Sequence, residues 1–273
     1  MKKVFLWLLI ISMIAVFSLA GCKSEAAEEV TEEETVEEPV EEPAVEEEVT
    51  EVIEEEETVG EAEEGAVPSD EMAEEVGTVT DIDGNVYHTV TIGTQVWMVE
   101  NLKVTHYRNG YLIPNITDGT QWGSLKTGAY CNYNNDSNNA DTYGYLYNWY
   151  AVNDSRNICP AGWHVPTDEE WETLETYLGG GTVAGGKMKE TGTEHWKSSN
   201  TGATNESGFT ALPGGYRRFD GIFHYVGGYG YWWSATEHNA TYAWYHYVGF
   251  SYSNLNRYYY SKELGFSLRC LRD

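Results

Sequence analysis

The sequence is short of basic residues and of long apolar runs. Its 273 residues hold 16 Lys and Arg against 44 Asp and Glu, which gives a formal net charge of −28. A chain with no basic face is not expected to bind nucleic acid. The longest apolar run, residues 4–17, is too short for a membrane-spanning helix, which needs about 20 apolar residues.

Motifs for catalysis are missing as well. The seven His and four Cys residues form no His-x-x-x-His or Cys-x-x-Cys pattern, and Ser234 lacks the Gly-x-Ser-x-Gly elbow of a hydrolase. The adjacent carboxylates of residues 168–170 are explained by the start of a helix. We therefore expect no catalytic residue and no enzyme activity, with an enzyme of unknown type as the remaining alternative.

The N-terminus carries an export pattern. Lys2 and Lys3 precede the apolar run, and Leu19-Ala20-Gly21-Cys22 follows it. The last four residues resemble the lipobox of bacterial lipoproteins, in which the leader (here 1–21) is cut off and the cysteine receives lipid. The resemblance implies a palmitate-type anchor on Cys22 that holds the protein to a membrane. The alternative is an ordinary signal peptide with a chance cysteine.

An acidic segment, residues 22–77, follows the leader. It holds 25 acidic residues, one basic residue (Lys23) and no aromatic residue. Such a composition cannot bury enough apolar surface to fold, so we expect a disordered tether. Residues 78–273 hold 13 basic and 19 acidic residues, so most of the acidity belongs to the tether.

The residues after Cys22 also bear on localisation. Lys23, rather than an Asp, favours an outer-membrane destination over inner-membrane retention. The acidic stretch resembles the surface-export signals of Bacteroidetes lipoproteins. We expect an outer-membrane lipoprotein of the cell envelope, on either the periplasmic or the surface-exposed face.

Residues 78–273 are expected to form one folded domain, in which 35 of 196 residues are aromatic. Thr167 and Glu170 form a capping box for a helix that ends at Gly179, and a second helix is expected over 186–190. Turn residues at Gly84 and Gly93 on either side of strand 86–92, followed by strand 95–99, predict an opening β-meander, and strands 231–236 and 242–248 are predicted to pair as a hairpin. In a closing strand, Phe266, Leu268 and Cys270 face one way and Ser267 and Arg269 the other.

Long aromatic and glycine-rich motifs occupy residues 97–102, 143–152, 159–171, 208–217 and 265–273 of this domain. Together and in this order, they resemble the Fibrobacter succinogenes major paralogous domain. The closing motif is similar to the formylglycine-generating enzyme type of C-type-lectin-like fold. The resemblance implies an α+β domain with small antiparallel sheets, one or two helices and long loops. It implies no activity.

Three cysteines remain once Cys22 carries lipid, which allows one disulfide in an exported protein. The resemblance to C-type-lectin-like domains implies a Cys159–Cys270 bridge, with Cys131 left as a buried thiol. Cys131 has no basic neighbour in sequence that would make it reactive.

One loop is rich in oxygen ligands. Asn134, Asp136 and Asp141 supply the side chains that calcium prefers, although the EF-hand spacing is missing. The equal alternative is turn chemistry, since Asn and Asp tolerate left-handed backbone. Calcium is thus a possible ligand, and no other cofactor is expected.

The expected function is a non-catalytic binding domain. Aromatic side chains on surface loops and strands are candidates for stacking on a glycan or for binding an envelope protein: Tyr229, Trp232, Trp244 and Tyr258. The Glu-Pro-Asn and Gln-Pro-Asp triplets of calcium-dependent lectins are absent, so the ligand class stays open. The alternative is a structural or adhesive envelope component without a discrete ligand.

Overall fold

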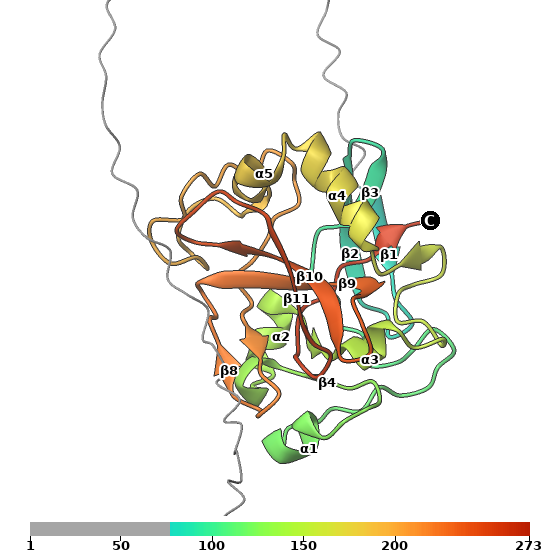
Figure 1. Ribbon diagram of the computed structural model, residues 1–273. Coiled ribbons are helices and arrows are strands. Elements are labelled where there is room, and N and C mark those ends of the chain that lie inside the picture. The colour runs from blue at the N-terminus through green and yellow to red at the C-terminus, as the bar shows by residue number, and fades with distance from the viewer. Residues whose placement is uncertain (1–76) are drawn as a thin grey trace, which may run out of the picture. The chain divides into compact units, whose positions relative to one another are not determined.

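The structure is a computed structural model, and it describes residues 77–273 (Figure 1). The expected leader, Cys22 and nearly all of the tether lie outside the described residues. Within 77–273, the fold is a mixture of small antiparallel sheets, short helices and long loops, as the α+β expectation requires. None of the helices in this part has the length and apolar character needed to cross a bilayer.

The larger sheet has five strands in the order β1-β2-β3-β12-β6. The first three form the predicted meander, because Gly84 supplies the positive φ of the first turn and Gly93 that of the second. The closing strand then inserts between β3 and β6, which brings the end of the chain back to its beginning. The five strands are β1 (Gly77–Thr80), β2 (Val86–Ile92), β3 (Gln95–Met98), β6 (Trp163–His164) and β12 (Leu271–Arg272).

The second sheet has three longer strands in the order β11-β10-β9. β9 (Tyr229–Glu237) and β10 (Tyr242–Gly249) form the predicted hairpin, and a bulge lies between Ala243 and Tyr245. β11 (Asn256–Ser261) pairs with β10 in register, with Tyr245 opposite Tyr258. This sheet carries most of the aromatic residues of the C-terminal part.

Shorter elements connect these sheets. Two pairs of two-residue strands lie in the middle of the chain: β4 (Tyr130–Cys131) with β5 (Leu146–Tyr147), and β7 (Tyr216–Arg217) with β8 (Phe223–His224). The short helices are α1 (Gly119–Gly123), the 3-10 turn η1 (Tyr133–Asn135), α2 (Asn138–Tyr143) and α3 (Trp149–Val152).

The longest helix, α4 (Asp168–Tyr177), begins with the predicted capping box. The Thr167 side chain accepts from the backbone N–H of Glu170, and the Glu170 carboxylate accepts from the Thr167 backbone. Trp171 and Leu174 are buried on its inner face, so the helical spacing predicted this face correctly.

The second helix differs from the prediction in its start. α5 spans Gly181–Met188, so it begins five residues before the predicted Gly186 and ends before Glu190. Its glycines allow a close approach to the loop after β10: a Cβ on Gly185 would lie 2.2 Å from the Asn254 carbonyl oxygen. Tertiary packing therefore sets this helix, since its glycines disfavour a helix on their own.

The closing segment is less regular than the predicted strand. Only Leu271–Arg272 form β12, and the preceding residues make single bridges, at Phe266 to Tyr147 and at Ser267 to Trp232. The predicted alternation is present, because the three apolar residues Phe266, Leu268 and Cys270 share one core cluster. The opposite side is also covered, so Ser267 and Arg269 are buried rather than exposed.

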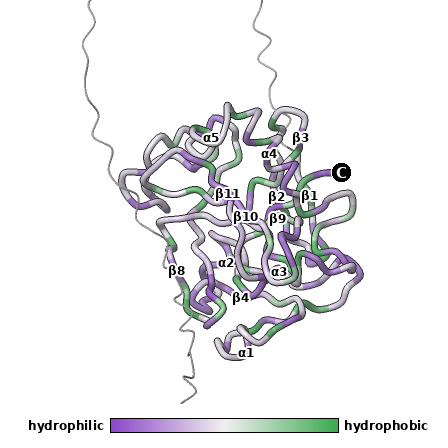
Figure 2. The backbone as a smooth tube through the Cα atoms, viewed as in Figure 1, coloured by the Kyte–Doolittle hydropathy of each residue, from purple (hydrophilic) through white to green (hydrophobic). Residues whose placement is uncertain are grey.

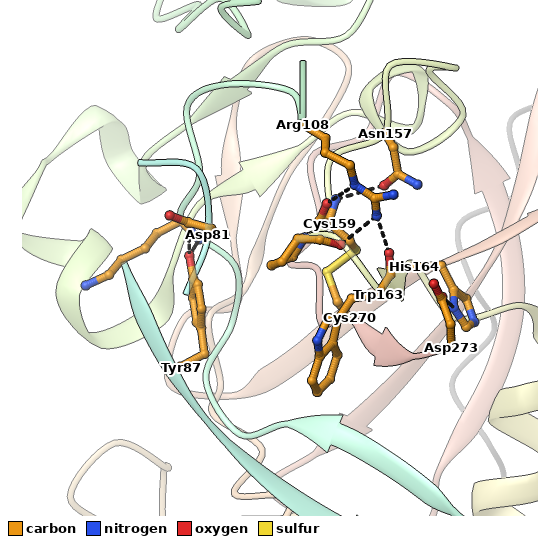
Figure 3. Close-up of a disulfide and its surroundings, with 11 residues drawn as sticks. Asp81, Tyr87, Arg108, Asn157, Cys159, Trp163, His164, Cys270 and Asp273 are labelled. Carbon is orange, nitrogen blue, oxygen red and sulfur yellow. Dashed lines mark hydrogen bonds and ion pairs between the residues drawn. A yellow bond between two sulfur atoms is a disulfide. The ribbon is translucent and has the colours of Figure 1, made fainter. Parts of the chain in front are cut away.

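The disulfide joins Cys159 and Cys270, as the family resemblance implied. Figure 3 shows Arg108 beside it, with the guanidinium pointing at backbone oxygens of the segment that carries Cys159. Arg108 donates to the carbonyl oxygens of Cys159 and Trp163. The bridge fixes the irregular segment 153–162 to the closing segment, and Arg108 fixes it to the loop after β3.

Apolar stretches of the chain are short and scattered along the backbone tube (Figure 2). The core is therefore assembled from many elements, and its largest members are aromatic. One cluster lies under the three-stranded sheet around Tyr231, Trp233 and Phe266, and another lies between α4 and the five-stranded sheet around Trp97 and Trp171.

Several cationic side chains are buried among loops. Arg269 is 1% exposed, and it donates to the Asn101 side-chain oxygen at 2.9 Å and to the carbonyl oxygens of Phe209 and Thr210. Burial lowers the pKa of Arg269 to about 9, which leaves the guanidinium charged at neutral pH. The guanidinium also lies 4.0 Å from the centroid of the Phe209 ring.

Replacing Arg269 by Met should lower the free energy of unfolding by about 3 kcal/mol or more, because the substitution leaves several buried acceptor oxygens without donors. Urea unfolding followed by tryptophan fluorescence measures this loss. The matched control is Arg272→Met, because Arg272 is the exposed residue of β12, and this variant should change stability by less than about 0.5 kcal/mol. Equal losses in the two variants would show that Arg269 is not a structural centre.

Candidate functional site

Aromatic side chains gather on the β9–β10–β11 sheet and on the neighbouring β7–β8 hairpin. Register decides which residues share a face, because cross-strand partners lie on the same side of a sheet. Tyr258, Tyr245 and Trp233 are partners on one face, and Trp244 and Tyr259 are partners on the other. Two groups of rings result. They meet at the outer strand β11, where the adjacent residues Tyr258 and Tyr259 start from opposite faces but have their rings in contact.

The first group is the ring stack, formed by His238, Tyr258 and Tyr259. The Tyr259 ring lies 3.9 Å from His238 at an interplanar angle of 13°, and 5.1 Å from Tyr258 at 1°. Trp244 meets Tyr259 edge-on at 5.2 Å. Tyr258 is 52% exposed, so the stack ends in a ring that is open to solvent.

An ion pair fixes the base of the ring stack. The Arg257 guanidinium lies 3.4 Å from the centroid of the Trp244 ring, and it donates to the Asp168 carboxylate through Nε at 2.8 Å and through Nη2. Asp168 is the first residue of α4, where the helix dipole favours a negative charge. The helix is thereby connected to the outer strand of the sheet.

A buried histidine completes this arrangement. His246 lies beneath the sheet, stacked at 4.8 Å on Trp171, and its Nε2 lies 3.1 Å from Oδ1 of Asp168. Burial lowers the pKa of His246 despite the nearby carboxylate, so the ring is neutral at neutral pH. Nε2 therefore carries the hydrogen and donates to Asp168. Burial alone would raise the pKa of Asp168, but bonds from His246 and Arg257 prevail and lower it to about 2.

The second group is the tyrosine cluster, formed by Tyr216, Tyr225, Tyr229, Tyr231 and Tyr247. Successive rings are 5.4 to 6.0 Å apart from Tyr216 through Tyr225 and Tyr229 to Tyr231. Beneath them, Phe266 stacks on Tyr231 at 5.2 Å. Burial raises the pKa of Tyr216 to about 12, so its hydroxyl stays neutral and can both donate and accept.

The structure brings together only some of the predicted ligand-binding residues. Trp244 and Tyr258 both contact Tyr259, so they belong to one site. Tyr229 lies in the tyrosine cluster, which reaches Tyr258 through Tyr245. Trp232 does not join either group: it is 0% exposed, and its Nε1 donates to Asn101 in the core. Its role in ligand binding stays a prediction, which this burial disfavours.

Sequence reasoning missed the residues that hold the site in place. Arg257 and Asp168 are 89 positions apart, and the acidic helix start had a sufficient local explanation. His238 follows the end of β9 and gives no pattern of its own. The only sequence signal was the run Tyr258-Tyr259-Tyr260 beside Arg257.

The loop considered for calcium is held by turn contacts. Asn134 has a positive φ of 54°, and Asp136 accepts from the Asn138 backbone N–H at 3.0 Å. Asp141 lies 3.5 Å from Lys103 and is almost fully exposed. Across residues 77–273, no group of three or more His, Cys, Asp or Glu side chains is placed to hold a metal ion. Calcium binding stays a prediction, and the turn contacts favour its alternative.

Cys131 is the free cysteine among the described residues, and it is buried. Burial raises the pKa of its thiol to about 12, so the thiolate that a nucleophile requires is scarce. The thiol packs in a third cluster with Trp122 and Leu146.

The fold and the site define a class of protein: a domain of small antiparallel sheets that is closed by a disulfide and carries clusters of tyrosine and tryptophan rings. The chain belongs to the family of the Fibrobacter succinogenes major domain, whose family model matches residues 90–272. Comparison with curated proteins gives no match, and comparison with solved structures gives none. The matched range includes both groups of rings and the disulfide.

The Asp168 carboxylate should contribute to stability only while it is ionised. Its pKa is 3.8 in a reference peptide and about 2 here, so the contribution is present above about pH 4 and is lost as the pH falls toward 2. Asp168→Asn should remove about 2 kcal/mol at neutral pH and much less near pH 2. Unfolding curves over this pH range test the slope.

The control for this measurement is Glu169→Gln, an exposed carboxylate on the same helical turn. It should keep the pH slope of the parent protein. Other carboxylates with lowered pKa values, such as Asp83 and Asp154, leave a residual slope in every variant. A slope in Asp168→Asn as steep as that of the parent would show that Asp168 does not contribute to the acid sensitivity.

Proposed function

We propose that this protein is an exported lipoprotein that displays a non-catalytic binding domain at the end of an acidic tether. Cleavage before Cys22 and lipid on that cysteine would attach it to the outer membrane. The head would have a C-type-lectin-like fold, which presents loops and strand edges on a scaffold closed by a disulfide. Its ligand would be a glycan or an envelope protein.

The exposed Tyr258 ring at the end of the ring stack is the observation that carries this proposal. An exposed aromatic ring normally loses side-chain freedom when it binds a ligand, and that loss weakens binding. Tyr258 is already held by Tyr259, which in turn contacts Trp244 and His238. The face of such a ring is electron-rich and suits the C–H bonds of a sugar or the edge of another ring.

The surroundings of the ring stack add polar partners. Arg257 and the exposed His238 lie beside the rings, and the hydroxyls of the tyrosine cluster continue along the sheet. Binding sites for polar ligands combine such aromatic surfaces with a few hydrogen-bonding groups.

Tyr258→Ala should weaken ligand binding at least about ten-fold, a change of about 1.4 kcal/mol. The chain from residue 23 onward would be screened against glycan arrays and used for pull-down from envelope extract. The matched control is Tyr111→Ala, since Tyr111 is also an exposed tyrosine, at 64% against 52% for Tyr258, but is far from the sheet in sequence. Unchanged binding in Tyr258→Ala, or no ligand in either screen, would favour the structural alternative.

The anchor has a separate test. Cys22→Ser should move the protein from the membrane fraction to the soluble fraction, because the thiol that accepts lipid is absent. Fractionation followed by mass spectrometry of the mature N-terminus measures this change. Membrane retention of Cys22→Ser would contradict lipidation at that residue.

A further inference from the structure

A second surface feature lies at the C-terminal end of α4, opposite to the end that carries Asp168. The C-terminal end of α4, the β2–β3 hairpin and α5 meet there (Figure 1). Between them is a half-open hollow of about 250 Å³. Its lining is mostly polar: Thr91, Ile92, Tyr177, Leu178, Lys187, Glu206 and Ser207.

One wall of the hollow is an exposed aromatic ring in a fixed position. Tyr177 is 64% exposed, yet its ring lies directly against the β2–β3 turn. A Cβ on Gly93 would be 2.8 Å from Cδ2 of this ring, so only glycine permits the contact. Gly93 also has a positive φ of 63°, which disfavours any other residue.

The turn and the helix are joined on a rigid base. Gln95, just after the turn, donates to the Glu170 carbonyl oxygen of α4 at 2.9 Å. Trp97 packs on Trp171 at 4.9 Å in the core below. The turn and the helix therefore hold the Tyr177 ring in its position before any ligand binds.

The facing wall is an ion pair. Lys187 Nζ lies 2.7 Å from Oε1 of Glu206, and both side chains are partly exposed. Ser207 fixes the segment that carries Glu206 to the segment that carries Lys187, because its backbone N–H and its hydroxyl both donate to the Lys187 carbonyl oxygen. The pair offers a hydrogen-bond donor and an acceptor side by side, with no net charge.

The size and polarity of the hollow select the ligand class. It is smaller than the roughly 300–1,000 Å³ of a pocket for a drug-sized molecule, so it suits one ring rather than a chain. Its polar lining disfavours the binding of an apolar side chain. The ion pair has no net charge, so it does not favour an anionic ligand. A neutral pyranose has one C–H face for an aromatic ring and neighbouring hydroxyls for a donor–acceptor pair.

We propose that this hollow binds a single neutral pyranose residue, with its ring on Tyr177 and its hydroxyls on Lys187 and Glu206. The site is separate from the ring stack and does not depend on the function proposed there. It would give the domain a subsite for one sugar, such as the end or a branch of a glycan.

The test uses the chain from residue 23 onward and the methyl glycosides of glucose, galactose, mannose and N-acetylglucosamine as probes. Titration at millimolar concentrations, followed by NMR of selectively labelled tyrosine, should shift the Tyr177 ring signals with at least one probe. Tyr177→Ala should weaken the binding of that probe at least about ten-fold, as measured by ligand-observed saturation transfer. Glu206→Gln, which removes the acceptor charge, should weaken it less.

Tyr111→Ala is the matched control, because Tyr111 has the same exposed fraction as Tyr177, 64%, and does not line the hollow, so the variant should leave binding of the methyl glycoside unchanged. Lost binding in Tyr258→Ala but not in Tyr177→Ala would overturn the subsite while supporting the ring stack. No shift of Tyr177 with any of the four probes would also overturn it. Thermal unfolding of each variant separates lost binding from lost folding, because Tyr177 is a surface residue and its replacement should leave the melting temperature near that of the parent.

Discussion

Buried cations that donate to backbone carbonyl oxygens are the interaction on which this fold depends. Long loops leave carbonyl groups without strand or helix partners, and each buried one needs a donor. Arginine carries five N–H donors and lysine three, so one side chain can serve several loops at once. Lys189 donates to Thr201, Gly249 and Tyr252, and the same use is made of Arg108, Arg217, Lys262 and Arg269.

These contacts also explain why the aromatic surface is rigid. Arg269 and Trp232 both donate to the Asn101 side-chain oxygen, so β9 is tied to the loop after β3. Lys262 donates to Ala240 in the β9–β10 turn and lies 4.6 Å from the Trp149 ring. The sheet that carries the ring stack is thus held in place at strand β9 and at the β9–β10 turn. Rings mounted on such a sheet keep their spacing without a ligand.

Local sequence signals predicted the parts that depend on neighbouring residues. The Thr167 capping box and the hairpins at Gly84 and Gly93 needed only the chemistry of a few adjacent positions. The disulfide required the family resemblance, because three cysteines alone permit three pairings. The Arg257–Asp168 pair and the burial of Trp232 could not be predicted, since each depends on residues brought together from distant parts of the chain.

The place of Cys131 has a consequence for how the protein matures. Cys131 lies in a different cluster from the disulfide, among Trp122, Tyr133 and Leu146. While the domain is unfolded, the thiols of Cys131, Cys159 and Cys270 are all accessible to oxidants, and two of the three possible bridges among them would trap Cys131. Burial of the 129–146 region ahead of oxidation would leave a single reactive pair. The order of folding and oxidation, rather than the final contacts alone, then determines the yield of correctly bridged protein.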